Sequence, residues 1–343
     1  MMKNDVIIPR IYNIEFLRIL FTFCIFSCHV CDMFRIVNYG RFSVEFFFIL
    51  SGFFLYYTID RQKDLPNFII KKMIRFLPLM LFGEIVCNLI RHNIFVENYM
   101  SLLFFLPGTG LSKVNHCALG TTWYVCVLMW VSVFYFYIIK TQRKATVNIS
   151  IGIITFLSFV ALSKISPVYM KHLFPHYILR GFANMGLGYF LCLIYEKYPK
   201  SFTSQKSILF SILEIWLIEY LVAAMFFPES FKLEYIHFVI LFLLLILSFL
   251  LKRGCISQFF DDDSWGKISK YCLSFFLTHL IIVNYLYSKF IFLTHLSKTV
   301  SFLVMFVLSA LLSVFAYHVI EKPCASYLRR LFNKETPVSQ EKD

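Results

Sequence analysis

The sequence predicts an all-α integral membrane protein with about ten transmembrane helices and both termini in the cytoplasm. Hydrophobic residues make up 59% of the 343-residue chain and charged residues only 15%, whereas soluble domains average roughly 45–50% and about 25%. Apolar runs of about twenty residues, the length of a spanning helix, recur along the whole chain. A soluble two-domain enzyme is therefore excluded, and the 42 Phe and 20 Tyr exclude a disordered chain.

Ten candidate spans follow one another, mostly through short connections. Their approximate bounds are 14–34, 43–60, 73–91, 121–140, 147–163, 177–196, 207–227, 233–251, 266–289 and 299–320. The one long connection, 92–120, contains an apolar stretch from Tyr99 to Leu106. This stretch is too short to span a bilayer, so we interpret it as an interfacial or re-entrant segment.

The positions of lysine and arginine set the orientation of the spans. With the N-terminus in the cytoplasm, the inner segments hold 22 of these residues and the outer loops hold 10, while Arg18 lies inside the first span. We expect one polytopic membrane domain over residues 1–332 and a short polar cytoplasmic tail over residues 333–343. Because the net charge of +13 follows the topology and forms no aromatic-laced basic patch, membrane lipids are expected partners and nucleic acid is not.

Three ionisable residues lie inside the first span: Glu15, Arg18 and His29. Eleven residues at 100° each place Arg18 and His29 on one helix face, about 16 Å apart along the axis. Glu15 lies one turn before Arg18 and is expected to pair with it. Because ionisable groups at membrane depth are costly, they indicate a functional site; the alternative is a buried ion pair beside a hydrogen-bonded histidine.

Glu45 lies near the outer end of the second span, at a depth comparable to that of His29. A carboxylate on one imidazole nitrogen would orient the ring and raise its basicity, so a His29–Glu45 dyad is predicted. The alternative is that Glu45 pairs with Arg41, one turn earlier. The sequence does not separate the two.

Lys72 and Arg75 lie at the cytoplasmic entrance of the third span, on the same side as Arg18. They are typical either of positive-inside anchoring to anionic lipid or of a polyphosphate site. In the second case a CoA thioester would rest its phosphates on Arg18, Lys72 and Arg75 while its acyl group reaches His29. His29 would then deprotonate an acceptor hydroxyl that attacks the thioester.

These residues also carry a resemblance, over nearly the whole chain, to the membrane acyltransferase 3 family of multi-spanning bacterial O-acyltransferases. The most specific match is Asn13-Ile-Glu-Phe-Leu-Arg18 followed by ten residues and His29. A second match is Val44-Glu-Phe-Phe-Phe-Ile-Leu-Ser-Gly-Phe53, which contains Glu45 and Ser51. Weaker similarities are Trp123-Tyr124, Ile268-Ser269 through Phe276 to His279, and Val319-Ile-Glu-Lys-Pro323.

The resemblance implies an acyl-CoA donor, most often acetyl-CoA, and a hydroxyl of a cell-surface or exported glycan or a lipid-linked sugar as acceptor. No metal is expected. It implies a multi-pass protein of the bacterial inner membrane, with His29 and Arg18 essential for catalysis and Glu45 beside them. Lys72 and Arg75 match the family's donor-binding pair, with Lys where Arg is usual. The residues expected to contact substrate are Trp123, His279 and Ser51.

Other signals are weaker. A transporter or flippase for an anionic or glycolipid substrate would use the same polar path from Arg18 to His29, but the sequence shows neither the internal repeats nor the paired helix breaks common in transporters. Asp261-Asp262-Asp263 is interpreted as a helix N-cap rather than as a metal site. Packing is the expected role of four polar groups at membrane depth: Glu214, Glu219, His237 and His318. The sequence predicts no oligomeric state.

Overall fold

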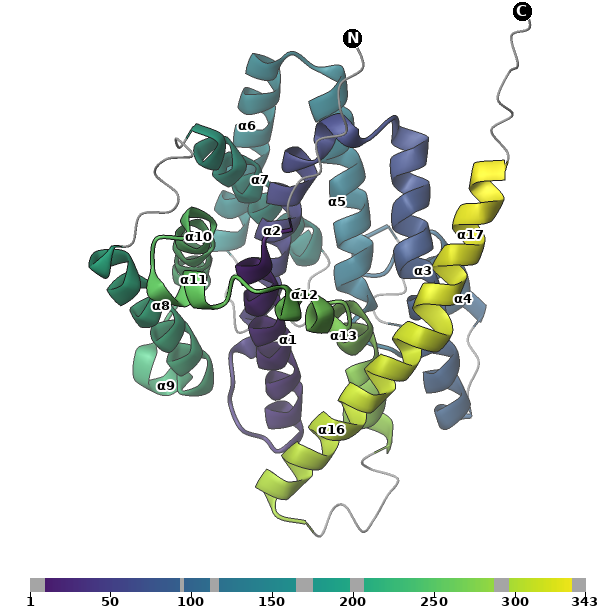
Figure 1. The fold of residues 1–343 in the computed structure, drawn as a ribbon. Coiled ribbons are helices and arrows are strands. Elements are labelled where there is room, and N and C mark those ends of the chain that lie inside the picture. Colours follow the sequence, from purple (N-terminus) through teal and green to yellow (C-terminus); the bar gives the residue numbers. More distant parts are fainter. Residues whose placement is uncertain are drawn as a thin grey trace, which may run out of the picture.

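The computed structural model describes residues 10–92, 96–111, 117–164, 175–197, 207–286 and 296–334. Within these ranges the chain forms helices and turns without strands (Figure 1). Eight helical segments are long and apolar enough to cross a membrane. They are α1 (Tyr12–Met33), α3 (Leu65–Arg91), α5 (Thr122–Thr141), α6 (Lys144–Ser163), α7 (Pro175–Lys197), α8 (Ile208–Phe226), Asp263–Tyr285 and Lys298–Phe332.

The other two predicted spans are also helical but shorter. Helix α2 (Ser43–Tyr57) has 15 residues and α10 (Tyr235–Leu251) has 17, which corresponds to about 22 and 25 Å at the α-helical rise. Both lengths fall below the roughly 30 Å of a typical hydrocarbon core. All ten predicted segments are therefore helical, while eight reach the length of a span. The remaining short elements are η1 (Gly40–Phe42), η2 (Ile59–Arg61), α9 (Pro228–Phe231) and α11 (Cys255–Phe259).

Helix α3 begins eight residues before the predicted third span. Its N-cap is Asp64, whose side chain accepts a hydrogen bond from the Asn67 backbone N–H at 2.9 Å. Lys72 and Arg75 therefore lie well inside the helix and not at its entrance. The predicted boundary was wrong because Lys71 and Lys72 interrupt the apolar run after Phe68-Ile69-Ile70, whereas the helix begins where the Asp64 cap places it.

The predicted ninth span is interrupted, so the expectation of one continuous helix over 266–289 is wrong. Helix α12 (Asp263–Ser269) ends in a turn at Lys270–Tyr271, and α13 (Cys272–Leu280) then runs into the π-helical η5 (Ile281–Leu286). This segment runs in the same direction as α1, as expected for two odd-numbered spans, because α12 meets the start of α1 and α13 meets its end. Irregular backbone at membrane depth is tolerated where protein covers it or water reaches it.

The last helix is longer than predicted. Helix α16 (Lys298–Ala316) continues through the π-helical η6 (Tyr317–Glu321) into α17 (Lys322–Lys334), and the whole forms a diagonal rod in Figure 1. The predicted end at residue 320 is therefore too early. The helix includes the first two residues of the predicted tail over 333–343, and the boundary between domain and tail stays a prediction. The rest of the predicted tail lies outside the described residues.

The long outer connection contains α4 (Val96–Leu103), which is too short to span. Turns follow it up to residue 111, where Gly108 and Gly110 adopt φ values of 75° and 84° that glycine tolerates best. A non-spanning helix followed by a glycine turn agrees with the predicted short segment, and its depth relative to a bilayer stays a prediction.

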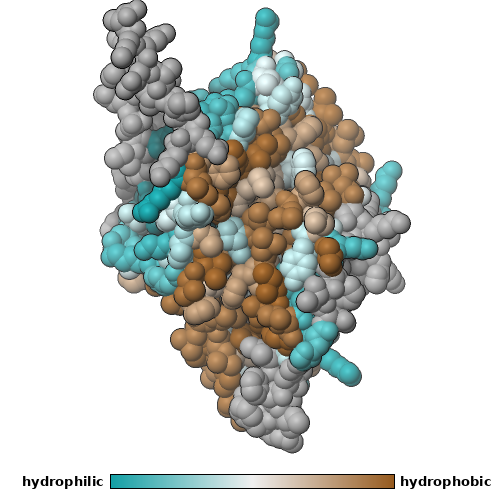
Figure 2. Space-filling model, turned by 90° about the vertical axis from the view of Figure 1, so that its right-hand side faces the viewer, coloured by the Kyte–Doolittle hydropathy of each residue, from teal (hydrophilic) through white to brown (hydrophobic). Residues whose placement is uncertain are grey.

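Helix α1 occupies the centre of the bundle (Figure 1). In its most apolar window 61% of the residues are buried, and in Asp263–Tyr285 67% are, against 28% in each of the peripheral helices α6, α8 and α16. The peripheral helices instead expose apolar side chains, among them Phe156, Ile212 and Leu303. Figure 2 shows one face covered mostly by hydrophobic residues, with hydrophilic ones gathered toward its margins. Such a surface fits a lipid environment.

The most extensive helix contact joins α2 to α7. Two glycines permit it, because a Cβ on Gly52 would overlap the Met185 carbonyl and a Cβ on Gly188 would overlap the Ile49 carbonyl. Small residues let helix backbones approach closely in membranes, where packing and not hydrophobicity drives association. The close packing of α2 against α7 therefore explains the glycine of the Ser51-Gly52 pair in the second span.

This contact predicts that Gly52→Ala and Gly188→Ala each destabilise the protein by about 1–3 kcal/mol, the usual cost of overpacking. The measurement is thermal unfolding of purified protein in detergent. The matched control is Gly152→Ala, because a Cβ there would meet only Phe190 at an ordinary 3.6 Å. If the Gly52 variant unfolds at the temperature of the Gly152 variant, the close approach of α2 and α7 is wrong.

Candidate functional site

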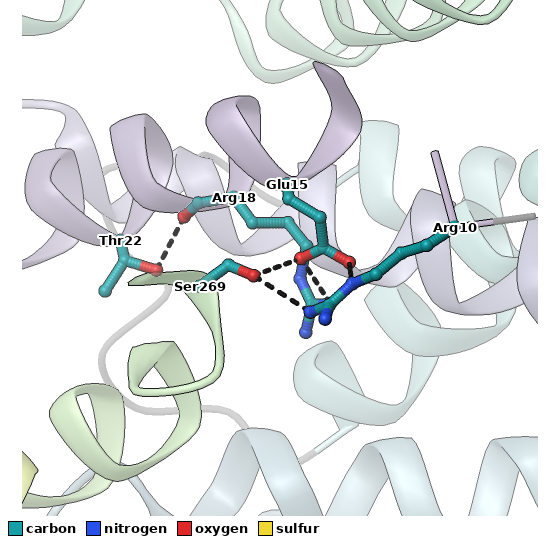
Figure 3. A network of polar contacts seen from close by, with 5 residues as sticks. All are labelled: Arg10, Glu15, Arg18, Thr22 and Ser269. Carbon is teal, nitrogen blue, oxygen red and sulfur yellow. Dashed lines mark hydrogen bonds and ion pairs between the residues drawn. The ribbon is translucent and has the colours of Figure 1, made fainter. Parts of the chain in front are cut away.

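The first half of α1 carries a polar network around Glu15 (Figure 3). Its carboxylate accepts hydrogen bonds from Arg10 Nε at 3.1 Å, from Arg18 at 3.2 Å and from the Ser269 hydroxyl at 2.5 Å. The predicted Glu15–Arg18 pair is therefore confirmed. The Arg18 side chain stays 26% exposed, so one carboxylate is shared by two guanidinium groups and Arg18 can still meet a further anion.

Arg75 lies on α3, close to this network. It is exposed, and it interacts electrostatically with Arg18, Glu321 and Tyr124. Glu321 sits in the π-helical η6 and accepts a hydrogen bond from the Ser274 hydroxyl at 2.6 Å. Helices α1, α3 and α13 and the continuous helix α16–η6–α17 thus meet here. Single π-helical turns are frequent at functional sites.

Lys72 stands beside Arg75 but faces aromatic rings. Its Nζ lies 5.1 Å from the centre of the Phe68 ring and 5.7 Å from that of Phe76, and the Arg75 guanidinium is 5.7 Å from the Phe76 ring. Such cation–π contacts hold a cation at low cost. Four basic residues (Arg10, Arg18, Lys72 and Arg75) thus share this region with two acidic ones (Glu15 and Glu321). Basic groups outnumber acidic ones here, which suits a polyphosphate.

His29 lies at the other end of the same face of α1 and is partly exposed. Its ring centre is 5.2 Å from that of His279 on α13, and the two planes are inclined by 39°. His279 itself is 1% exposed and is surrounded by the rings of Phe26, Phe275 and Phe276. The structure therefore brings together two predicted site residues that lie 250 positions apart.

Glu45 does not join them. Its Oε1 accepts from Arg180 Nε at 2.5 Å, and its Oε2 accepts from Asn184 Nδ2 at 2.5 Å and from the Tyr235 hydroxyl at 3.2 Å. With both oxygens engaged by α7 and α10, the predicted His29–Glu45 dyad is wrong as a geometry. Charge explains the arrangement, because a carboxylate that is 0% exposed requires a cation within reach.

The alternative prediction, an ion pair between Glu45 and Arg41, is also wrong, because Arg41 pairs with Asp32 at 3.4 Å. Arg180 is the fourth residue of the predicted sixth span, and its side chain is only 7% exposed. Its depth was the available signal, because a charge inside a span demands a partner. No feature of the sequence indicated that its partner would be Glu45, 135 residues away.

The other two residues expected to contact substrate, Trp123 and Ser51, border different networks. Trp123 stacks on Tyr177 at 4.2 Å and lies 5.2 Å from the Arg180 guanidinium, so it borders the Glu45 network. The Ser51 hydroxyl donates to the Phe47 carbonyl at 2.7 Å. It also adjoins Tyr124, which interacts with both Arg18 and Arg75. Tyr124 is thus the residue of this helix that faces the cationic cluster, one position after the predicted Trp123.

Glu84 on α3 is a second buried carboxylate, and it is not among the residues that the sequence predicted. Its oxygens accept from the backbone N–H groups of Ala118 and Leu119 at 3.1 and 3.2 Å and from the amides of Asn88 and Asn98 at 3.2 and 2.9 Å. These bonds tie α4 and the segment before α5 to α3. A carboxylate inside the third predicted span was the available signal.

Several other polar groups serve local structure. Asp262 caps α12 by accepting from the Ser264 N–H at 2.9 Å, which confirms the helix-cap interpretation. Hydrogen bonds from the Ser264 side chain and backbone lower the pKa of this carboxyl. Glu214 accepts from the Ser257 N–H at 2.9 Å, and His237 accepts from the Glu234 N–H at 3.2 Å. His318 contacts the Tyr271 hydroxyl at 3.1 Å.

Cys28 and Cys31 flank His29 with two residues between them, a spacing also found in metal and redox sites. Both are free thiols, and both face Asn38, with Cys28 Sγ 3.3 Å from its carbonyl oxygen and Cys31 Sγ 3.8 Å from its amide nitrogen. Over the described ranges no group of three or more His, Cys, Asp or Glu side chains is placed to hold a metal ion.

Comparison with known protein families identifies the family of this chain. Residues 11–318 match the acyltransferase 3 family, described as an acyltransferase domain. The chain belongs to this family. No curated protein and no solved structure matches it. Family membership and the membrane-length helices together make the protein a membrane acyltransferase.

The acyltransferase match covers both ends of the α1 face. Arg18, His29, Arg75 and His279 fall inside it, whereas Arg10 and Glu321 lie just beyond its two ends. The predicted family resemblance is confirmed. The individual roles of these residues stay predictions.

The Glu45 network predicts a loss of stability rather than a selective loss of chemistry. Glu45→Gln leaves the buried Arg180 without a carboxylate and should cost about 3–5 kcal/mol of unfolding free energy. Asp263→Asn breaks an ion pair with Lys267 whose side chains are 58% and 71% exposed, and should cost about 0–1 kcal/mol. Thermal unfolding in detergent compares the two. A Glu45→Gln protein as stable as wild type but inactive would return Glu45 to the reaction.

Proposed function

We propose that this membrane acyltransferase is an O-acyltransferase of the bacterial inner membrane. It moves an acyl group, acetyl foremost, from acyl-CoA to a hydroxyl of a cell-surface or exported glycan or a lipid-linked sugar. The observation that carries the proposal is the spacing along α1. A cationic cluster at Arg18 and an imidazole at His29 lie on one face, about 16 Å apart, and that separation is of the order of an extended pantetheine arm.

The cationic cluster supports the donor end of the proposal. Arg18 and Arg75 repel each other unless an anion lies between them, and guanidinium groups hold phosphate through paired N–H donors. Lys72 lies beside Arg75, over the same Phe76 ring, and offers a further basic group to an anion. The phosphates of CoA would rest here, and the thioester would extend along α1 toward His29.

At the other end His29 acts as the general base. Its free nitrogen takes the proton of the acceptor hydroxyl, and the oxygen attacks the thioester carbonyl carbon. When the tetrahedral intermediate collapses, the C–S bond breaks and the CoA thiolate takes the proton from the imidazolium. An ester and free CoA leave, and neutral His29 is restored.

One observation favours the second candidate, a transporter or flippase. The break at Lys270–Tyr271 is the kind of helix interruption that transporters use at substrate sites. Membership in an acyltransferase family weighs against it. The two functions differ in whether a covalent bond is made, and the label-transfer assay below distinguishes them.

His29→Ala is expected to reduce transfer of radiolabel from acetyl-CoA to membrane glycan by about 10²–10⁴-fold, the usual contribution of a general base. The assay uses purified protein in vesicles with membrane glycan as acceptor. His237→Ala is the matched control, because that histidine only caps α10. Transfer by His29→Ala at the wild-type rate removes His29 from the mechanism, and absence of label in wild-type glycan overturns the proposed function.

Arg75→Ala is expected to weaken recognition of the phosphates and not the chemistry. Acetyl-pantetheine lacks the nucleotide phosphates, so the ratio of kcat/KM for acetyl-CoA over acetyl-pantetheine should fall at least tenfold in Arg75→Ala, equal to about 1.4 kcal/mol of lost binding. Lys71→Ala should leave the ratio unchanged, because Lys71 is exposed and contacts Gln62 at 3.3 Å. An unchanged ratio in Arg75→Ala would withdraw its phosphate role.

A further inference from the structure

The tautomer of His279 follows from its surroundings. Its Nδ1 lies 3.1 Å from the carbonyl oxygen of Phe275. A carbonyl oxygen only accepts hydrogen bonds, so Nδ1 carries the proton and donates it. Nε2 must then be the nitrogen with the lone pair, and the ring is held in one orientation by its own helix.

The Nε2 atom of His279 is unsatisfied in the described part of the chain. It is inaccessible to solvent and has no hydrogen-bond partner there, although leaving a buried acceptor unpaired costs about 1–3 kcal/mol. The rings around His279 belong to Phe26, Phe275 and Phe276, which offer no donor. The remaining ring neighbour is His29.

The distance between the two rings fits a direct bond. An edge-to-edge N–H···N contact of about 2.9 Å between imidazoles needs ring centres roughly 5 Å apart, and the two centres are 5.2 Å apart. The planes are inclined by 39°, so a rotation of the partly exposed His29 ring about its Cβ–Cγ bond completes the alignment.

We infer that His279 is the positioning residue of His29: its Nε2 accepts the N–H of His29 and so leaves the other His29 nitrogen unprotonated toward the acceptor hydroxyl. This inference rests on the proposed function, and it replaces the carboxylate of the predicted dyad with a neutral imidazole. During the reaction the hydroxyl proton passes to the free nitrogen of His29. The N–H toward His279 stays in place, and the CoA thiolate later removes the transferred proton.

The arrangement has a physical advantage in a membrane. A carboxylate beside His29 would place a second charge at membrane depth, where ionised groups are costly. A neutral acceptor fixes the tautomer without that charge. A partner that fixes the tautomer of a general base supports its rate even though the partner touches no substrate.

The experiment compares two substitutions of His279 in the radiolabel assay. His279→Phe keeps a planar ring among Phe neighbours but has no acceptor, and should lower kcat at least 100-fold while KM for acetyl-CoA changes less than threefold. His279→Gln keeps an acceptor oxygen and should retain activity within tenfold of wild type. His237→Phe is the matched control, expected to leave kcat unchanged.

A second readout addresses His29 directly. Nitrogen-15 NMR of histidine-labelled wild-type protein should show His279 protonated at Nδ1 and His29 in a single tautomer, and His29 should become a tautomer mixture in His279→Phe. A wild-type His279 protonated at Nε2 overturns the inference even if no variant folds. If His29→Ala is inactive but His279→Phe is fully active, the positioning role fails alone. If His29→Ala transfers label at the wild-type rate, His29 is not the base and the inference fails with it. If wild-type protein transfers no label, the proposed function fails.

Discussion

Helices α2 and α7 are held together by a buried ion pair, and the rest of the bundle depends on that contact. Glu45 and Arg180 are 0% and 7% exposed on their side chains, so neither charge is tolerable without the other. Gly52 and Gly188 bring the two backbones close enough for the pair to form. Through Asn184 and Tyr235 the same network reaches α10, and through Trp123 it reaches α5.

The interrupted ninth segment lies along α1 and serves it twice: Ser269, at the end of α12, binds Glu15, while His279, on α13, contacts His29. An unbroken helix presents its faces at a fixed 100° per residue. The turn at Lys270–Tyr271 removes that restriction, so both ends of one α1 face receive a partner from the same segment.

The part of the site that the sequence predicted is the part with local periodicity. Arg18 and His29 share a face, and Glu15 pairs with Arg18, because helical geometry alone decides both. The partner of Glu45 was not predictable in the same way. His29 has a matching depth and Arg41 a matching spacing, whereas Arg180 lies 135 positions away, and no single-chain pattern reports which spans become neighbours.

The sequence by itself determined that this protein lies in a membrane, where its apolar helices fall along the chain, and to which family it belongs. These properties depend on composition, run length and motif spacing, which are read along the chain. Tertiary structure alone decided that Glu45 belongs to a packing network, that the ninth segment breaks beside α1, and that His279 is the neighbour of His29. Each of these depends on which buried polar group finds a partner across the bundle. That choice is a property of three-dimensional packing, because a polar group at membrane depth must be satisfied by whichever helix lies against it.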